Sequence, residues 1–256
     1  MVAETGSTNS DLLARLHGLA PRHLLLAITQ TAGRGRAGRS WLSSAETSLT
    51  FSLAWKFQRS LHELAGLPLA VGVVIAETMA QFDLEVRLKW PNDILRSGAK
   101  LAGVLIESSV AADKRAVWAV IGVGLNVLPP GADIDWPTAH MDTGTALRGP
   151  AIRGPASRGP AFSSPLDRNL LMARLLDALA AGMNLFEEQG FEAFQSRWNA
   201  LHAHAGQTVR IIDHGKVLHE GVAVGVDAGG RLLLDSAQGR IAVVAGDVSL
   251  RPLMEA

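Results

Sequence analysis

The spacing of apolar residues predicts alternating strands and helices over the first half of the chain. Short apolar runs typical of strands occupy residues 23–30, 47–55, 86–89, 100–108 and 116–123. Apolar residues within 67–82 recur three and four positions apart, which predicts a helix, and Pro68 is tolerated in its first turn. Near the start, Thr8 followed by Asp11 predicts the capped beginning of a short helix.

The second half begins with helical spacing and ends with strict alternation. Residues 166–189 and 191–202 predict two helices. From residue 207 onward apolar and polar residues alternate, and turn signals recur about every ten residues, which predicts a small SH3-like barrel. The pattern therefore predicts an α+β protein, with a main domain over residues 1–204 and a small β domain over 205–256.

A low-complexity segment separates these halves. The unit Arg-Gly-Pro-Ala begins at Arg148, at Arg153 and again at Arg158. Three such short copies are too few for a solenoid. We interpret residues 148–165 as a surface insertion because of their composition, and a basic tether for an acidic partner is the alternative.

Composition narrows the function classes. Lys+Arg and Asp+Glu balance at 24 each, without the basic surplus typical of nucleic-acid-binding proteins. The absence of cysteine excludes disulfides and thiolate chemistry. The apolar stretch 64–76 is shorter than a membrane-spanning helix, and residues 1–4 do not resemble a secretory signal. We expect a cytoplasmic protein that acts without a membrane or nucleic acid.

The segment from Gly33 to Arg39 carries the strongest chemical signal. It reads Gly-Arg-Gly-Arg-Ala-Gly-Arg, so alternate glycines allow close backbone approach while three arginines repel one another. A bound phosphate or carboxylate accounts for both features. The segment lacks the Lys-Ser/Thr ending of a P-loop. A flexible basic loop without a ligand is the alternative.

Two later segments add candidate site residues. Lys89 and Lys100 flank a predicted turn, and Gly103 leaves space beside the following strand. A lysine at a pocket edge is suited to hold a carboxylate or phosphoryl oxygen, although isolated strand-end lysines are commonly solvated. The Gly-Val-Gly at 122–124 lacks the third glycine of a dinucleotide fingerprint. We interpret the histidines of His202-Ala203-His204 as surface residues, since positions i and i+2 of a helix diverge.

These motifs resemble those of one enzyme family. Five motifs occur in the order seen in biotin protein ligases. They are Glu-Thr-Gly-Ser-Thr-Asn at 4–9, the Gln-to-Trp segment 30–41, Lys-Trp-Pro-Asn-Asp at 89–93, Lys-Leu-Ala-Gly at 100–103 and Gly-Val-Gly-Leu-Asn at 122–126. The resemblance implies a mixed-sheet catalytic domain of the biotin/lipoate ligase type, followed by the family's small last domain. Because the Ser-Thr-Asn motif starts at residue 7, we expect no DNA-binding domain before it.

The resemblance implies a two-step reaction. Biotin's carboxylate attacks the α-phosphorus of MgATP, giving biotinyl-5′-AMP and pyrophosphate. A lysine of a biotin carboxyl carrier domain then attacks the acyl carbon and releases AMP. We expect Mg²⁺ to arrive with ATP, without a metal site in the protein. A lipoate or octanoate ligase of the same fold and a non-catalytic biotin-binding regulator are the alternatives, and the sequence leaves monomer and homodimer open.

The resemblance also assigns site residues. Those for biotin are Ser7, Thr8, Asn9, Gln30, Gly33, Arg34, Gly35, Arg36, Trp41, Lys100, Gly103, Leu105 and Gly122. Those for ATP are Arg34, Arg36, Arg39, Lys89, Asn92, Asp93, Lys100 and Asn126. Lys100, Arg34 and Arg36 are the expected catalytic cations.

Some of these assignments keep an alternative. The alternative for Thr8 is helix capping, and the alternative for Gln30 is a polar group at a strand end. Trp41 is equally a core residue. Asp93 suits proton transfer or Mg²⁺ placement as well as turn capping. The resemblance assigns Asn126 to the adenine edge.

Overall fold

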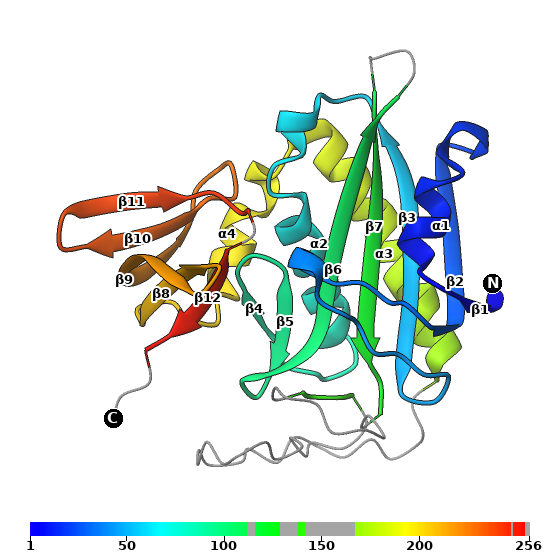
Figure 1. Cartoon of the computed structure of the whole chain (residues 1–256), viewed down its shortest axis with the longest axis horizontal. Helices are drawn as coiled ribbons and strands as arrows, with labels where there is room; N and C mark the ends of the chain where they lie inside the picture. The colour runs from blue at the N-terminus through cyan, green and yellow to red at the C-terminus, as the bar shows by residue number, and fades with distance from the viewer. Residues whose placement is uncertain (112–115, 129–137, 142–166, 247, 254–256) are drawn as a thin grey trace.

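The computed structural model describes residues 1–111, 116–128, 138–141, 167–246 and 248–253. The predicted insertion 148–165 lies outside the described residues. The chain forms a large mixed sheet with helices on both faces and a second, smaller sheet beside it (Figure 1). The prediction of an α+β fold is therefore confirmed.

The large sheet has seven strands in the order β1-β2-β3-β7-β6-β5-β4. Their bounds are Val2–Thr5 (β1), Arg22–Gln30 (β2), Ser48–Phe57 (β3), Arg87–Lys89 (β4), Asp93–Arg96 (β5), Ala99–Val110 (β6) and Val117–Asn126 (β7). β1 pairs with β2 in parallel, and all other neighbours are antiparallel. Strands β1 and β5 were not predicted. β5 forms because Ser97 and Gly98 both adopt positive φ and close a tight hairpin onto β6.

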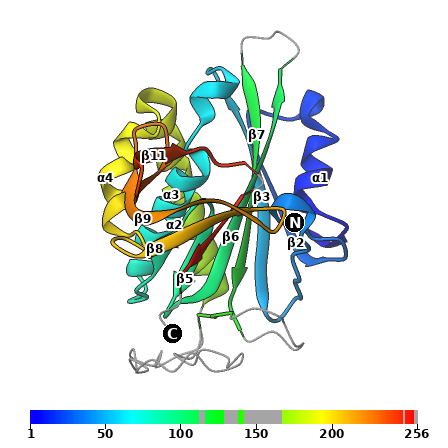
Figure 2. The same ribbon diagram turned by 60° about the vertical axis from the view of Figure 1, so that its left-hand side comes forward.

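The two faces of this sheet have different coverings, as Figures 1 and 2 show. Helices α2 (Leu67–Ala80) and α3 (Arg168–Gln189) cover one face, where Phe51, Ile121 and Leu179 belong to the main core. The short helix α1 (Thr8–Leu13) covers the β2–β3 end of the other face. Helix α4 (Glu192–Ala200) follows α3 and contacts α2 and β9 of the smaller sheet. The uncovered part of the second face is thus available for a site.

The structure adds three short 3₁₀ turns to the predicted elements and shows where α1 begins. The 3₁₀ turns are Leu16–Gly18, Arg36–Gly38 and Leu61–Leu64. The N-cap of α1 is Ser7, whose side chain accepts from the Ser10 backbone N–H. The predicted Thr8–Asp11 capping box is wrong, because the Asp11 carboxylate instead accepts from the Thr5 hydroxyl at 2.5 Å. This leaves the Thr8 hydroxyl available for other partners.

The apolar segment containing α2 differs from the prediction in length. Leu61–Ala80 spans 20 residues and, by length and composition alone, is long enough to cross a membrane. The prediction that this stretch is too short is therefore wrong. In the fold, 67% of the most apolar 18-residue stretch of this segment is buried, because α2 lies against the sheet, α3 and α4.

The smaller sheet contains five antiparallel strands in the order β11-β10-β9-β8-β12. They are Thr208–Asp213 (β8), Lys216–Val226 (β9), Leu232–Ser236 (β10), Gly239–Val243 (β11) and Ser249–Pro252 (β12). The predicted alternation of apolar and polar residues is confirmed. In the described part of the chain β11 and β12 are the two edges of the sheet and do not pair with each other, so a closed barrel is not confirmed. The Trp90 indole donates to the Gly230 carbonyl at 3.2 Å and ties this sheet to the β4–β5 side of the large one.

Candidate active site

A cleft of about 460 Å³ opens on the face of the large sheet that α1 leaves uncovered. Its walls come from α1, the loop containing Arg34 to Trp41, strands β2 to β7 and strand β12 of the smaller sheet. Segments far apart in the sequence therefore meet at one site.

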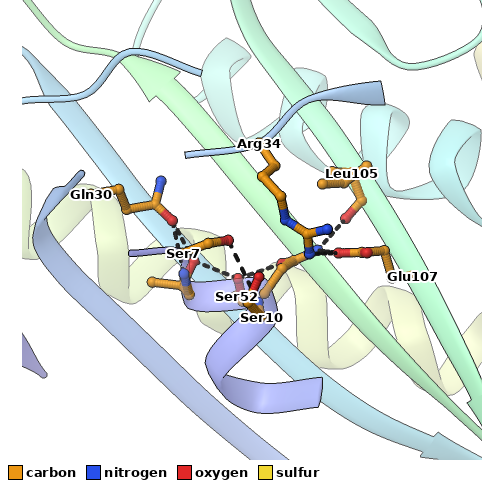
Figure 3. Close-up of polar contacts among 9 residues, drawn as sticks. Ser7, Ser10, Gln30, Arg34, Ser52, Leu105 and Glu107 are labelled. Atoms are coloured by element: carbon orange, nitrogen blue, oxygen red, sulfur yellow. Dashed lines mark hydrogen bonds and ion pairs between the residues drawn. The ribbon is translucent and has the colours of Figure 1, made fainter. Parts of the chain in front are cut away.

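The β2–β3 end of the cleft presents neutral hydrogen-bonding groups (Figure 3). The Gln30 side-chain oxygen accepts from the Thr8 backbone N–H at 2.9 Å and from its hydroxyl at 3.0 Å. The Ser52 hydroxyl lies 2.6 Å from both the Thr8 hydroxyl and the Asn9 side-chain oxygen. Ser52 was not predicted, although a serine between the core residues Phe51 and Leu53 must face this side of β3. This end suits an uncharged donor–acceptor group.

Glycines form the floor at the centre. Gly103 of β6 and Gly124 of β7 are register partners, and Gly122 lies two residues away on the same face. A Cβ at Gly122 would overlap the Asn9 amide, and one at Gly124 would overlap the Trp41 indole. The interpretation of Gly-Val-Gly as ending a strand is refined, since both glycines lie inside β7. Their role is to let other groups lie directly against the backbone.

A β-bulge directs Lys100 into the cleft. Strand pairing moves from Ile94↔Ala102 to Leu95↔Lys100, so β6 carries one extra residue at this point. Lys100 consequently shares a face with Gly103, three residues away, instead of pointing to the opposite face. The Lys100 carbonyl accepts from the Ala139 N–H at 2.8 Å and from the Asn126 amide at 3.2 Å, which fixes this backbone.

The ammonium group of Lys100 occupies a defined position. It forms an ion pair with the Asp93 carboxylate at 2.6 Å and lies 5.6 Å from the centroid of the Trp41 ring. Asp93 comes from β5, directly opposite Gly103. A cation is thus held over the glycine floor at the middle of the cleft.

The arginine loop crosses above this floor and has protein partners. Arg34 forms a 2.7 Å ion pair with Glu107, which also accepts from the Asn9 amide at 2.9 Å (Figure 3). Arg36 donates to the Asn92 side chain at 3.1 Å and to the carbonyl of Gly246, which lies between β11 and β12. Glu107 was not predicted, although it follows Gly103 and Leu105 at the two-residue spacing of one strand face.

The β4 end of the cleft contains Lys89, His204 and Arg251. Burial lowers the pKa of Lys89, the Asp93 carboxylate opposes this, and Arg251, Lys100 and Arg39 add to the lowering. Arg251 and His204 were not predicted as site residues. They come from the C-terminal quarter of the chain, where no motif marks them.

The predicted surface position of His202 and His204 is wrong. The two residues are only 6% and 8% exposed. The pKa of His202 is lowered to about 4, mainly by burial and to a smaller extent by His204. The pKa of His204 is also lowered to about 4, mainly by burial and to a smaller extent by the charge of Lys89. Both rings are therefore neutral at pH 7.

The predicted site residues lie together, with two exceptions. Gly33 and Asn126 do not line the cleft, whereas every other predicted residue does. Gly33 supports the loop by accepting from the Trp41 N–H at 2.8 Å. Asn126 supports Lys100, as described above. Within the described residues, no group of three or more His, Asp or Glu side chains is arranged to hold a metal ion.

Comparisons with known proteins agree with this fold. Residues 3–126 match the biotin/lipoate A/B protein ligase family, and 204–251 match the biotin protein ligase C-terminal domain. The chain is 33% identical over 251 residues to the bifunctional ligase/repressor BirA of Salmonella typhimurium, covering 96% of this chain and 72% of BirA. It is 34% identical over 256 residues to the biotin–[acetyl-CoA-carboxylase] ligase of Mycobacterium tuberculosis, covering 97% and 87%.

Solved structures extend the comparison. The biotin protein ligase of Aquifex aeolicus in complex with biotin and ATP superposes with a TM-score of 0.75 at 26% identity, covering 98% of this chain and 97% of that one. The fold and cleft thus define a ligase of the biotin/lipoate type. Within that class, the chain belongs to the biotin protein ligase family.

Proposed function

We propose that this ligase uses ATP to attach biotin to a lysine of a biotin carboxyl carrier domain, through biotinyl-5′-AMP. One observation carries the proposal. Across the sheet, neutral hydrogen-bonding groups at the β2–β3 end give way to Lys100 at the centre and Lys89 at the β4 end. A neutral ring bearing a carboxylate, followed by a polyphosphate, has the same order of polarity.

The cleft can hold the two substrates for the first step. The Thr8 and Gln30 groups bind the ureido ring, the buried Ser52 hydroxyl orients the Thr8 hydroxyl, and the glycine floor lets the bicyclic ring approach the strands. The biotin carboxylate then lies near Lys100, where one of its oxygens attacks the α-phosphorus of ATP. The bond from that phosphorus to the bridging oxygen breaks, and pyrophosphate leaves.

Positive charge at the centre favours this step. Lys100 and Arg36 neutralise two anions that repel each other and the charge that develops between them. Arg34 joins them by exchanging its Glu107 partner for the ligand. Asp93 orients the Lys100 ammonium through their ion pair. Mg²⁺ enters with ATP as part of the substrate.

The second step transfers the acyl group. The amine of the acceptor lysine, having lost its proton, attacks the biotinyl carbonyl carbon. The bond between that carbon and the phosphate oxygen breaks, so AMP leaves and an amide forms. Closure of the arginine loop over the mixed anhydride excludes the water that would hydrolyse it.

We propose that residues 205–256, which contain the smaller sheet, form an SH3-like unit. The C-terminal family match and the alternating strands support this assignment. The described strands pair as an open sheet, so the remaining closure is part of the proposal.

The function is tested by measuring pyrophosphate release with MgATP and either biotin or lipoate. We expect release that depends on biotin and not on lipoate. Labelled biotin should then pass to the lysine of a carrier domain, and a carrier with that lysine changed to arginine is the matched control. Release that depends on lipoate supports the lipoate ligase alternative, and binding of biotin without release supports the regulator alternative.

A further inference from the structure

At the β4 end of the cleft, residues 201–203 lie beside the last strand of the large sheet. The Leu88 N–H donates to the Leu201 carbonyl, and the Ala203 N–H donates to the Leu88 carbonyl, both at 2.8 Å. Residues 201–203 therefore run alongside β4 and cover its edge, with His202 paired in parallel to Leu88. This pairing places His204 beside Lys89, at the end of the cleft.

His204 is buried without a hydrogen-bond partner on one ring nitrogen. Its Nδ1 is sealed from solvent and has no partner among the described residues, so Nε2 is the ring nitrogen that can meet a ligand in the cleft that the side chain lines. Leaving such a group unpaired is costly in a folded protein. His202 next to it also lacks partners, but it does not line the cleft and packs against Trp198 at 4.7 Å between ring centroids.

The surroundings of His204 favour an anionic ligand. Lys89 acts electrostatically on His204, and Arg39, Lys100 and Arg251, which line the same cleft, act on Lys89. Asp93 is the acidic group that acts on this cluster, and it is already paired with Lys100. Burial, and after it the charge of Lys89, lowers the pKa of His204, so the imidazole is neutral and offers one N–H donor.

We propose that His204 binds the β- or γ-phosphate of the nucleotide, the part that leaves as pyrophosphate. This inference rests on the proposed function. The α-phosphate must lie beside the biotin carboxylate at Lys100, so the remaining nucleotide extends either towards β4 or away from it. The β4 direction is lined by Lys89 and Arg251, and cations at this density suit phosphates better than a neutral nucleoside.

The inference is tested by direct binding of inorganic pyrophosphate and of AMP to the full chain, measured by calorimetry. His204→Leu removes the donor, and we expect pyrophosphate affinity to fall about tenfold, as for loss of one hydrogen bond to a charged group. AMP affinity should not change. His204→Gln retains a side-chain N–H and should recover most of the loss. His202→Leu is the matched control, with affinities like those of the unchanged protein.

The outcomes separate this inference from the proposed function. Unchanged pyrophosphate affinity in a folded His204→Leu protein overturns the inference, as does a loss confined to AMP, which would place the nucleoside at this end. If His204→Leu does not give a cooperative melting transition, His204→Gln is compared with His204→Phe in the same assay. Because binding is measured without turnover, an inactive unchanged protein would contradict the proposed function alone.

Discussion

Replacement of Lys100 by methionine is expected to slow biotin-dependent pyrophosphate release by about 10²–10³-fold, the usual effect of removing one preorganised donor from a developing charge. Methionine keeps most of the apolar stem over Gly103 but removes the ammonium that pairs with Asp93 at 2.6 Å. The loss should fall on the rate at saturating biotin and ATP. Stopped-flow detection of pyrophosphate in the first turnover measures it.

The matched control for this change is Lys216→Met. Lys216 begins β9 on the exposed hairpin of the smaller sheet and does not line the cleft. Its replacement should leave the rate unchanged. A Lys100→Met protein that retains more than about a tenth of the rate would contradict the role assigned to this cation.

Acidification from pH 7 to pH 5 is expected to lower the free energy of unfolding by about 4 kcal/mol, nearly equally divided between His202 and His204. Both residues have a pKa of about 4 in the folded protein, against the ordinary histidine value of 6.5. The unfolded chain therefore binds more protons between these values, and protons favour unfolding. The stabilisation is complete above about pH 6.5 and is lost as the pH falls towards 4.

Urea melts at the two pH values measure this change. Stopping at pH 5 keeps ordinary carboxyl groups ionised, so the histidines dominate. The control is the His202→Phe, His204→Gln double variant, whose stability should depend much less on pH over this range. Equal pH dependence in both proteins would contradict the account of two neutral, buried imidazoles.

Hydrophobic spacing predicted most of the fold because most elements are long enough for the pattern to repeat several times. The ten-residue β3 and the 14-residue α2 are examples. Strands β1 and β5 were missed because they have only four residues each. Too few positions alternate in such short strands to give a periodic signal. The pairing of β5 with β6 depends instead on the hairpin turn at Ser97-Gly98.

The site was predictable where local motifs carry it and not where tertiary contacts do. The arginine loop and Lys100 were found from sequence, but the direction of the Lys100 side chain depends on a bulge that alternation does not reveal. Glu107 looked like an ordinary strand residue until Arg34 and Asn9 were seen to share its carboxylate. His204 belongs to the site only because residues 201–203 pair with the edge of β4.

We propose that the cleft places biotin and ATP in line across the sheet, with Lys100 between them. A crystal structure of the protein grown with biotin and MgATP tests it most directly. We predict electron density for biotinyl-5′-AMP, with the ureido ring bonded to Thr8 and Gln30 and the phosphate within hydrogen-bonding distance of the Lys100 ammonium. An adenylate bound elsewhere, or bound here with Lys100 still paired only to Asp93 and Arg34 to Glu107, would contradict the account.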